Sequence, residues 1–127
     1  MPLVRISLMQ GRPTSFGQRV GEVVYRTMVD TINVPPRDNF QLITEHDKSS
    51  LVYDPGYLGI SRTDGVIVIQ ITLSEGRTVE AKKALYKTLA DRLHAELGVR
   101  TEDVFISLVE VRKENWSFGN GIAQYVQ

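Results

Sequence analysis

The sequence contains an internal repeat, in which residues 2–46 can be laid on residues 67–111 without a gap. The aligned positions include Gly11 with Gly76, Arg12 with Arg77, Asp38 with Asp103 and Phe40 with Phe105. Few aligned pairs are identical, but a strand ending, a Gly-Arg turn and an aspartate before a phenylalanine recur at matching places. Such a repeat indicates one supersecondary unit used twice, whose copies bury a common core. It also separates duplicated residues from unique ones, which are the better candidates for chemistry.

The first copy reads as strand, helix, strand. Residues 3–8 are apolar and partly alternating, as is typical of a strand. Apolar residues then recur every four positions over 15–32, which indicates one buried face of a helix. Pro35-Pro36 cannot continue that helix, and residues 40–44 form the second expected strand.

The second copy repeats this pattern with clearer signals. Residues 66–73 form a run rich in β-branched side chains, which predicts a buried central strand. Leucines then recur every four positions along a helix for which Thr78 is the expected N-cap and Gly98 the expected left-handed C-terminal cap. Residues 104–109 form the last expected strand.

Two such units predict an α+β fold, with one four-stranded sheet and both helices on one face. We expect residues 1–127 to form a single domain, in which residues 47–65 join the two copies. The tight-turn signal Asn120-Gly121 predicts that the tail, residues 112–127, folds into a small hairpin. Because the helices cover only one face of the sheet, the other face needs a cover, which predicts a homo-oligomer.

The composition excludes several classes of function. The formal net charge is zero, with 15 basic and 15 acidic residues, which argues against nucleic-acid or membrane-surface binding driven by bulk charge. The absence of cysteine excludes disulfides and thiolate sites. Two histidines are too few for a histidine-based metal site, so we expect no metal and no cofactor. No segment approaches the roughly 20 apolar residues of a membrane span, and the start lacks signal-peptide features, so a cytoplasmic protein is expected.

Several motifs in the chain resemble a known superfamily, the tautomerases. They are the start Met1-Pro2-Leu3-Val4, the strand ending Gly11-Arg12 and the tail Phe118-Gly119-Asn120-Gly121. The longer match is to the malonate semialdehyde decarboxylase-like branch of that superfamily, through Val34-Pro35, Asp38, Gln41, Trp116-Ser117-Phe118-Gly119 and Ala123-Gln124-Tyr125. The resemblance covers nearly the whole chain and depends on the order and spacing of these motifs.

The resemblance implies a homotrimer of fused units, with a site around Pro2, which becomes the amino terminus once Met1 is removed. It implies that Asp38 activates a water molecule and that Arg77 is one of two arginines that bind a carboxylate substrate. The sequence departs from the decarboxylase pattern at Glu75, which stands where the second arginine is expected. This exchange disfavours decarboxylation and the binding of a doubly charged acid.

The chemistry of Pro2 supports the same site independently. A terminal proline is a secondary amine, and an α-amino group has a reference pKa of about 7.7–8.0. Burial lowers such a pKa and nearby carboxylates raise it. Near neutrality the amine can act as a general base that moves a proton between carbon and oxygen, or it can form an iminium adduct with a carbonyl compound. The alternative is that proline at this position has no role.

The charged candidates each have a functional and a structural interpretation. Arg77 can hold a carboxylate through two parallel hydrogen bonds, and its repeat partner Arg12 can do the same, although either can also be a surface arginine. Asp38 can handle a water molecule or steer the charge on Pro2. Its repeat partner Asp103 illustrates the alternative, an aspartate that caps a turn.

Three further residues complete the candidate site. Trp116 and Phe118 can wall an apolar pocket, or they can simply pack the tail at a subunit contact. Glu75 either faces solvent or pairs with Arg77, and both alternatives stay open.

The leading hypothesis is a tautomerase or hydratase that depends on Pro2 and acts on small 2-oxo or unsaturated carboxylic acids. Keto–enol exchange of an arylpyruvate is the model reaction. Decarboxylation of a 3-oxo acid is the variant, and a non-catalytic small-molecule-binding or trimeric interaction module is the alternative from a different class, because fold alone does not separate them.

Overall fold

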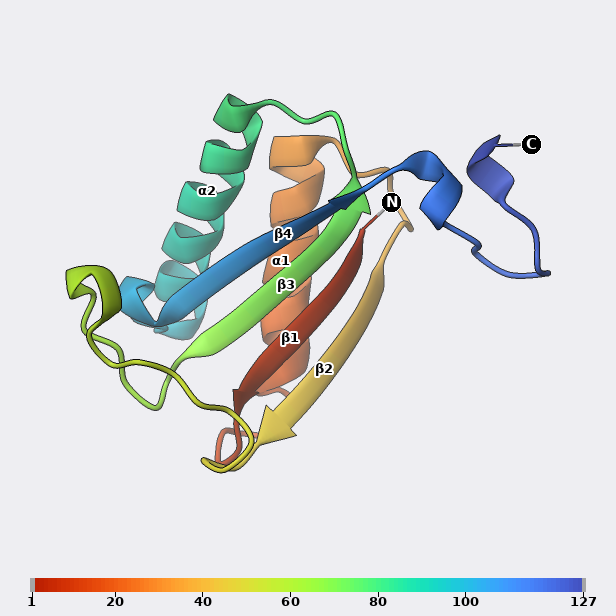
Figure 1. The fold of residues 1–127 in the computed structure, drawn as a ribbon. Helices are drawn as coiled ribbons and strands as arrows, with labels where there is room; N and C mark the ends of the chain where they lie inside the picture. The colour runs from red at the N-terminus through yellow and green to blue at the C-terminus, as the bar shows by residue number, and fades with distance from the viewer. Residues whose placement is uncertain (1, 127) are drawn as a thin grey trace.

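The two copies of the repeat form the two halves of one mixed sheet, with both helices on the same side (Figure 1). The structure is a computed structural model and describes residues 2–126. The first copy consists of β1 (Leu3–Met9), α1 (Phe16–Ile32) and β2 (Phe40–His46). The second copy consists of β3 (Ile67–Ser74), α2 (Val79–Leu97) and β4 (Val104–Val111). The predicted α+β fold is therefore confirmed.

The strand order β2-β1-β3-β4 follows from joining two parallel pairs. Within each copy the strands run parallel, and β1 and β3 pair antiparallel at the centre. Parallel neighbours need a crossover connection, which α1 and α2 provide. Because β1 and β3 run in opposite directions, the start of β1 and the end of β3 lie at the same end of the sheet. Leu3 accordingly pairs with Phe40 on one side and Thr72 on the other.

The core lies between the sheet and the two helices. Alternate residues of the central strands point to the helices and are buried, as the period of a strand requires: Val4, Ile6, Leu8, Ile67, Ile69, Ile71 and Leu73. The helices bury Val20, Val24, Met28, Leu85, Leu89 and Leu93 against them. Each such side chain contributes about 1.5–3 kcal/mol by its removal from water.

Local sequence signals set the ends and the approach of the helices. Thr78 caps α2 by accepting a hydrogen bond from the Ala81 amide at 3.1 Å, and Gly98 ends the helix in a left-handed conformation (φ 69°), both as predicted. In α1, a Cβ on Gly21 would collide with the Gln41 side chain, whose Nε2 donates to the Gly21 carbonyl at 2.8 Å. No helix within the described residues is long and apolar enough to cross a membrane.

Residues 2–126 leave most of the sheet face opposite the helices uncovered. On the two outer strands it presents large apolar side chains, with Phe40 53%, Leu42 46%, Phe105 46% and Val109 38% exposed. Arg5 and Gln70 lie between them on the central strands and are also exposed. The bare face expected from the repeat is therefore present.

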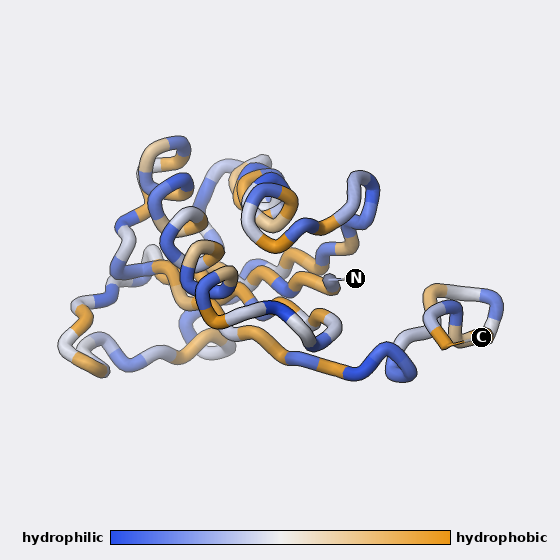
Figure 2. Tube along the Cα trace, turned by 90° about the horizontal axis from the view of Figure 1, so that it is seen from above, coloured by the Kyte–Doolittle hydropathy of each residue, from blue (hydrophilic) through white to orange (hydrophobic). Residues whose placement is uncertain are grey.

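The tail differs from the expected hairpin, because residues 112–126 contain two short 3-10 turns and no strand. The predicted turn at Asn120-Gly121 is present, but three successive residues have positive φ, starting with Gly119 at 138°, so the chain cannot extend into a strand there. The Gln124 side chain closes the loop in place of a backbone ladder. Figure 2 shows this tail reaching out from the rest of the fold.

Candidate active site

Pro2 lies at one end of the sheet, where the central strand β1 begins. It is buried and directly precedes β1. Because Leu3 pairs with Phe40 and Thr72, the chain start is flanked by the segment before β2, which carries Asp38, and by the last residue of β3, Ser74. The strand register therefore brings together residues that lie far apart in the sequence.

Asp38 lies within electrostatic range of the other charged groups at this end of the sheet, the amino terminus and Arg77. Burial raises the pKa of its carboxyl group, while the positive charges of the amino terminus and of Arg77 act in the opposite direction. The structure therefore places the predicted carboxylate and the predicted guanidinium at the end of the sheet where the chain begins.

Arg77 follows the end of β3 and links that strand to the end of α1. Its Nη1 donates to the Ser74 carbonyl at 3.1 Å, and its Nη2 and Nε donate to the Ile32 carbonyl at 3.3 and 3.4 Å. A guanidinium has five N–H donors, so these contacts leave it capacity for a further acceptor. The backbone carbonyls fix its orientation, which suits a group that must meet a carboxylate in one geometry.

Aromatic residues of the tail are anchored at the same end of the sheet. Trp116 Nε1 donates to Ser74 Oγ at 3.1 Å, and its ring stacks on Phe118 with centroids 5.5 Å apart. Phe118 in turn meets Tyr125 edge to face at 4.9 Å. The structure therefore joins both predicted tail aromatics to the end of β3.

Tyr125 is a candidate that the sequence analysis did not single out. Burial raises the pKa of its phenol, nearby Asp38 raises it further, and Arg77 lowers it. Tyr125 thus lies in the electrostatic field of both charged candidates. Its membership of the Ala123-Gln124-Tyr125 motif was the available signal, but nothing in the sequence alone indicated which groups it faces.

Glu75 is exposed on the turn between β3 and Arg77, in agreement with the solvent-facing alternative. Its backbone amide donates to the Val111 carbonyl at 2.9 Å, which extends the pairing of β3 with β4. Glu75 and Arg77 both line a hollow of about 460 Å³ between the end of α1 and the start of α2. A carboxylate therefore lines the same hollow as the guanidinium, at the sequence position where a second cation was expected.

Arg12 lies at the opposite end of the sheet. It follows β1, whereas Pro2 precedes it, so the strand separates them by about 23 Å at ~3.3 Å per residue. Arg12 Nη2 donates to the Gly65 carbonyl at 3.0 Å, and its guanidinium lies 4.2 Å from the centroid of the Phe16 ring. The two duplicated arginines therefore have different surroundings, and within one chain only Arg77 is near Pro2.

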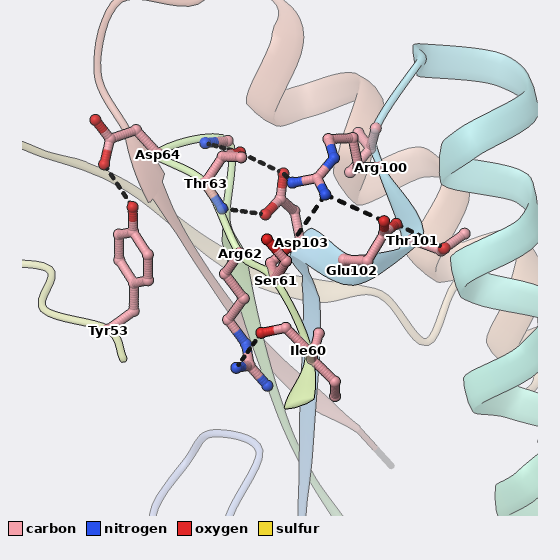
Figure 3. Close-up of polar contacts among 12 residues, drawn as sticks. Tyr53, Ile60, Ser61, Arg62, Thr63, Asp64, Arg100, Thr101, Glu102 and Asp103 are labelled. Atoms are coloured by element: carbon pink, nitrogen blue, oxygen red, sulfur yellow. Dashed lines mark hydrogen bonds and ion pairs between the residues drawn. The ribbon is translucent and has the colours of Figure 1, made fainter. Parts of the chain in front are cut away.

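Asp103 is held in a network of hydrogen bonds (Figure 3). Its carboxylate accepts from the Thr63 amide at 2.8 Å and from Thr63 Oγ1 at 2.6 Å, and Arg100 Nη1 lies 3.5 Å away. The residue is 2% exposed. It fastens the linker to the start of β4, as a structural turn residue would, and Ile67 occupies the position that Pro2 holds in the first copy.

Replacement of Asp103 by alanine is expected to lower the free energy of unfolding by about 2–4 kcal/mol, because the amide and hydroxyl of Thr63 would lose a charged acceptor that is itself buried. The rate constants of the purified folded protein should not change. Chemical denaturation and steady-state kinetics measure the two effects, and a lost rate with unchanged stability would contradict the structural role of Asp103.

Comparison with known proteins identifies the family. A family model described as tautomerase enzyme matches residues 38–119. The chain is also 49% identical to Probable tautomerase YusQ of Bacillus subtilis (strain 168) over 127 residues, which is 100% of both chains. The chain belongs to the tautomerase family. Probable tautomerase YrdN of the same organism is 35% identical over 126 residues, covering 99% of this chain and 97% of the relative.

Solved structures place this tautomerase in the malonate semialdehyde decarboxylase-like branch. FG41 malonate semialdehyde decarboxylase inhibited by 3-bromopropiolate superposes with a TM-score of 0.90 at 35% identity, covering 98% of this chain and 94% of that one. Native fused 4-OT superposes with a TM-score of 0.78 at 20% identity and covers 98% of each chain, which shows a shared fold. The protein is an enzyme of the tautomerase superfamily, so the non-catalytic alternative is set aside.

No group of three or more histidine, aspartate and glutamate side chains within residues 2–126 is arranged to hold a metal ion.

Proposed function

We propose that this tautomerase uses Pro2 to interconvert or hydrate small 2-oxo or unsaturated carboxylic acids. The observation that carries the proposal is the position of Pro2, which is buried at one end of the sheet between Asp38 and the end of β3. Arg77 supplies a cation at the same end of the sheet. This chemistry needs a general base, a cation that holds the carboxylate of the substrate, and a protein carboxylate that directs a water molecule.

Removal of Met1 makes Pro2 a secondary amine that can accept a proton. With the substrate carboxylate held by Arg77, the Pro2 nitrogen takes a proton from C3 of a 2-oxo acid. The electron pair of that C–H bond forms the C2=C3 double bond, and the carbonyl oxygen becomes an enolate that is then protonated to the enol. In the hydration variant, Asp38 directs a water molecule at an unsaturated carbon.

Inactivation chemistry tests this proposal. A structural relative is inhibited by 3-bromopropiolate, and we expect the same compound to inactivate this protein in step with loss of phenylpyruvate enolisation. Intact mass should first show that Met1 is absent, and peptide mapping should then place the adduct on Pro2. Enolisation by a sample that fully retains Met1, or an adduct elsewhere in the chain, would refute a mechanism based on the Pro2 amine.

Decarboxylation of malonate semialdehyde is the second candidate. It is favoured by the similarity to two malonate semialdehyde decarboxylases, at 35% and 30% identity. Glu75 disfavours it, because a carboxylate stands where the decarboxylase pattern has a second arginine, so the cation expected at that position is missing. Comparing the decarboxylation rates of the wild type and of Glu75→Arg tests this interpretation, since the variant should gain activity if Glu75 is the obstacle.

We also propose a homotrimer as the assembly. The exposed apolar residues Phe40, Leu42, Phe105 and Val109 on the open sheet face support it, because large apolar patches usually mark an interface. A fused 4-OT of the same fold forms a symmetric trimer. Light scattering during size-exclusion chromatography gives the mass, and a monomer at micromolar concentration would contradict the proposal.

The raised pKa of Asp38 predicts an opposition between stability and activity. A carboxyl group whose pKa is higher in the folded than in the unfolded protein binds protons more tightly when folded, so stability falls as the pH rises through that raised pKa. Asp38→Asn should therefore raise the melting temperature at neutral pH and lose this advantage in acid, where the wild-type carboxyl is protonated. The hydration rate should fall by about 100-fold or more, because a group that handles the proton is lost. Calorimetry at several pH values and kinetics would measure both, and a variant less stable than the wild type at neutral pH would contradict the argument.

A further inference from the structure

The connection between α1 and β2 turns sharply just before Asp38. The Asp38 amide donates to the Pro35 carbonyl at 3.2 Å, which closes a four-residue turn that ends at Asp38. Pro36 occupies the second position of this turn and Arg37 the third, where its φ is 74°. Proline at the second position and a positive φ at the third are the features of a type II turn. The backbone that leads into Asp38 therefore depends on the conformation of this turn.

Arginine is an unfavourable residue for the third position of a type II turn. Its Cβ makes the left-handed conformation costly, which is why glycine usually occupies that position. A type I turn has a negative φ at the third position and suits most residues. The two forms share the closing hydrogen bond and differ by a reversal of the central peptide, here the one between Pro36 and Arg37. The type II form at Arg37 therefore needs support from outside the turn.

Tyr25 of α1 supplies that support. The Arg37 amide donates to Tyr25 Oη at 2.9 Å. This N–H belongs to the central peptide of the turn, so a reversal of that peptide would point it away from the hydroxyl. The hydrogen bond therefore favours the type II form. Tyr25 is half-buried on a helix that packs into the core through Val24 and Met28, so the acceptor is held by a rigid element.

A second hydrogen bond fastens the segment on the other side of Asp38. Gln41 Nε2 donates to the Gly21 carbonyl at 2.8 Å. Gly21 and Tyr25 are four residues apart and lie on the same face of α1. The segment from Arg37 to Gln41 is therefore attached to one face of the helix at both ends, and Asp38 is next to the first attachment.

We propose that Tyr25 is a positioning residue, which sets the place of the Asp38 carboxylate by holding Arg37 in the left-handed conformation. The inference rests on the proposed function, in which Asp38 directs a water molecule. The Tyr25 hydroxyl acts through the backbone and exchanges no proton with the substrate. Without it the turn exchanges between its two forms, and the backbone beside Asp38 is no longer fixed. Catalytic groups have to be held within about 0.5 Å of the productive geometry.

The variant Tyr25→Phe tests the hydroxyl, because it keeps the ring and removes only the acceptor. We expect kcat for hydration of 2-oxo-3-pentenoate to fall by about 10-fold, with KM changed little, since small displacements of a reacting group are costly. The loss should be smaller than that of Asp38→Asn, which removes the carboxylate itself. Tyr86→Phe is the matched control, since Tyr86 lies on the exposed side of α2, and it should keep the wild-type kcat. Equal kcat for Tyr25→Phe and the wild type would overturn the proposal.

Rescue by Arg37→Gly separates positioning from a general structural effect. Glycine adopts the left-handed conformation without the cost that arginine carries, so this variant keeps the type II form without help from the hydroxyl. Added to Arg37→Gly, the Tyr25→Phe exchange should change kcat by less than about 2-fold, which a double-mutant cycle measures. The same loss of kcat in both backgrounds would assign Tyr25 to another role and overturn the proposal.

The turn can also be observed without a catalytic assay. In a type II turn the Pro36 Hα lies close to the Arg37 amide hydrogen, whereas in a type I turn the reversed peptide moves these two hydrogens apart. The nuclear Overhauser effect between them should be strong in the wild type and weaker in Tyr25→Phe, and an unchanged effect would overturn the proposal. If the wild type catalysed neither hydration nor enolisation, the proposed function would fail, while this measurement would still report whether Tyr25 holds the turn.

Discussion

The processed Pro2→Ala variant is expected to enolise phenylpyruvate about 10²–10⁴-fold more slowly than the wild type, which is the usual contribution of a general base. Alanine still leaves a terminal amine, but a primary one without the ring that fixes the nitrogen and fills the buried position at the sheet edge. The base therefore changes both in position and in chemistry. The measurement is the rate in the absorbance assay for the enol, after subtraction of the buffer-catalysed rate.

The fold should tolerate this change, because residue 2 precedes β1 and Leu3 begins the paired strand. Circular dichroism and the melting curve would show whether it does. Pro13→Ala is the matched control, since Pro13 is exposed beyond the far end of β1 and should keep the wild-type rate. Equal rates for Pro2→Ala and the wild type, with Met1 absent from both, would exclude Pro2 as the base.

Arg77→Ala is expected to lower kcat/KM by about 100-fold or more. A hydrogen bond to a charged group contributes about 1.5–3 kcal/mol, and each 1.4 kcal/mol corresponds to a factor of about 10, so loss of a two-bond carboxylate contact gives at least this effect. The variant should also unfold more easily, because Arg77 donates to the Ile32 and Ser74 carbonyls. Steady-state kinetics of folded protein and chemical denaturation separate the two effects.

The repeat supplies the control for this experiment. Arg12 occupies the equivalent position in the first copy but contacts Gly65 and Phe16 at the other end of the sheet. Arg12→Ala should lose about 1–2 kcal/mol of stability from a hydrogen bond and a cation–π contact, with kcat/KM unchanged. Arg77→Lys should fall between Arg77→Ala and the wild type, because lysine keeps the charge but cannot form the two parallel bonds. A larger kinetic effect at Arg12 than at Arg77 would place the substrate carboxylate at the opposite end of the sheet and contradict its assignment to Arg77.

The elements of the fold could be predicted because their signals are local. The four-residue spacing of leucines predicted α2, and Thr78 and Gly98 act as caps as expected, since capping depends on a few neighbouring backbone groups. The hairpin in the tail was wrong for a physical reason. The Asn120-Gly121 signal specifies a turn but not the strands that flank it, and here the Gln124 side chain makes the closing hydrogen bonds.

The amino-acid sequence by itself determined the duplicated unit, the buried faces of its strands and helices, and the presence of one unduplicated Pro2, because periodicity and repetition are properties of neighbouring positions. Only the tertiary structure decided which duplicated residues share a neighbourhood. The antiparallel pairing of β1 with β3 places Arg77 at the end of the sheet that holds Pro2 and Arg12 at the opposite end. The same pairing leaves Asp38 within electrostatic range of Arg77, whereas Asp103 is enclosed in its own hydrogen bonds. Strand direction depends on contacts between distant segments, so two residues that look alike in the sequence have different surroundings in the fold.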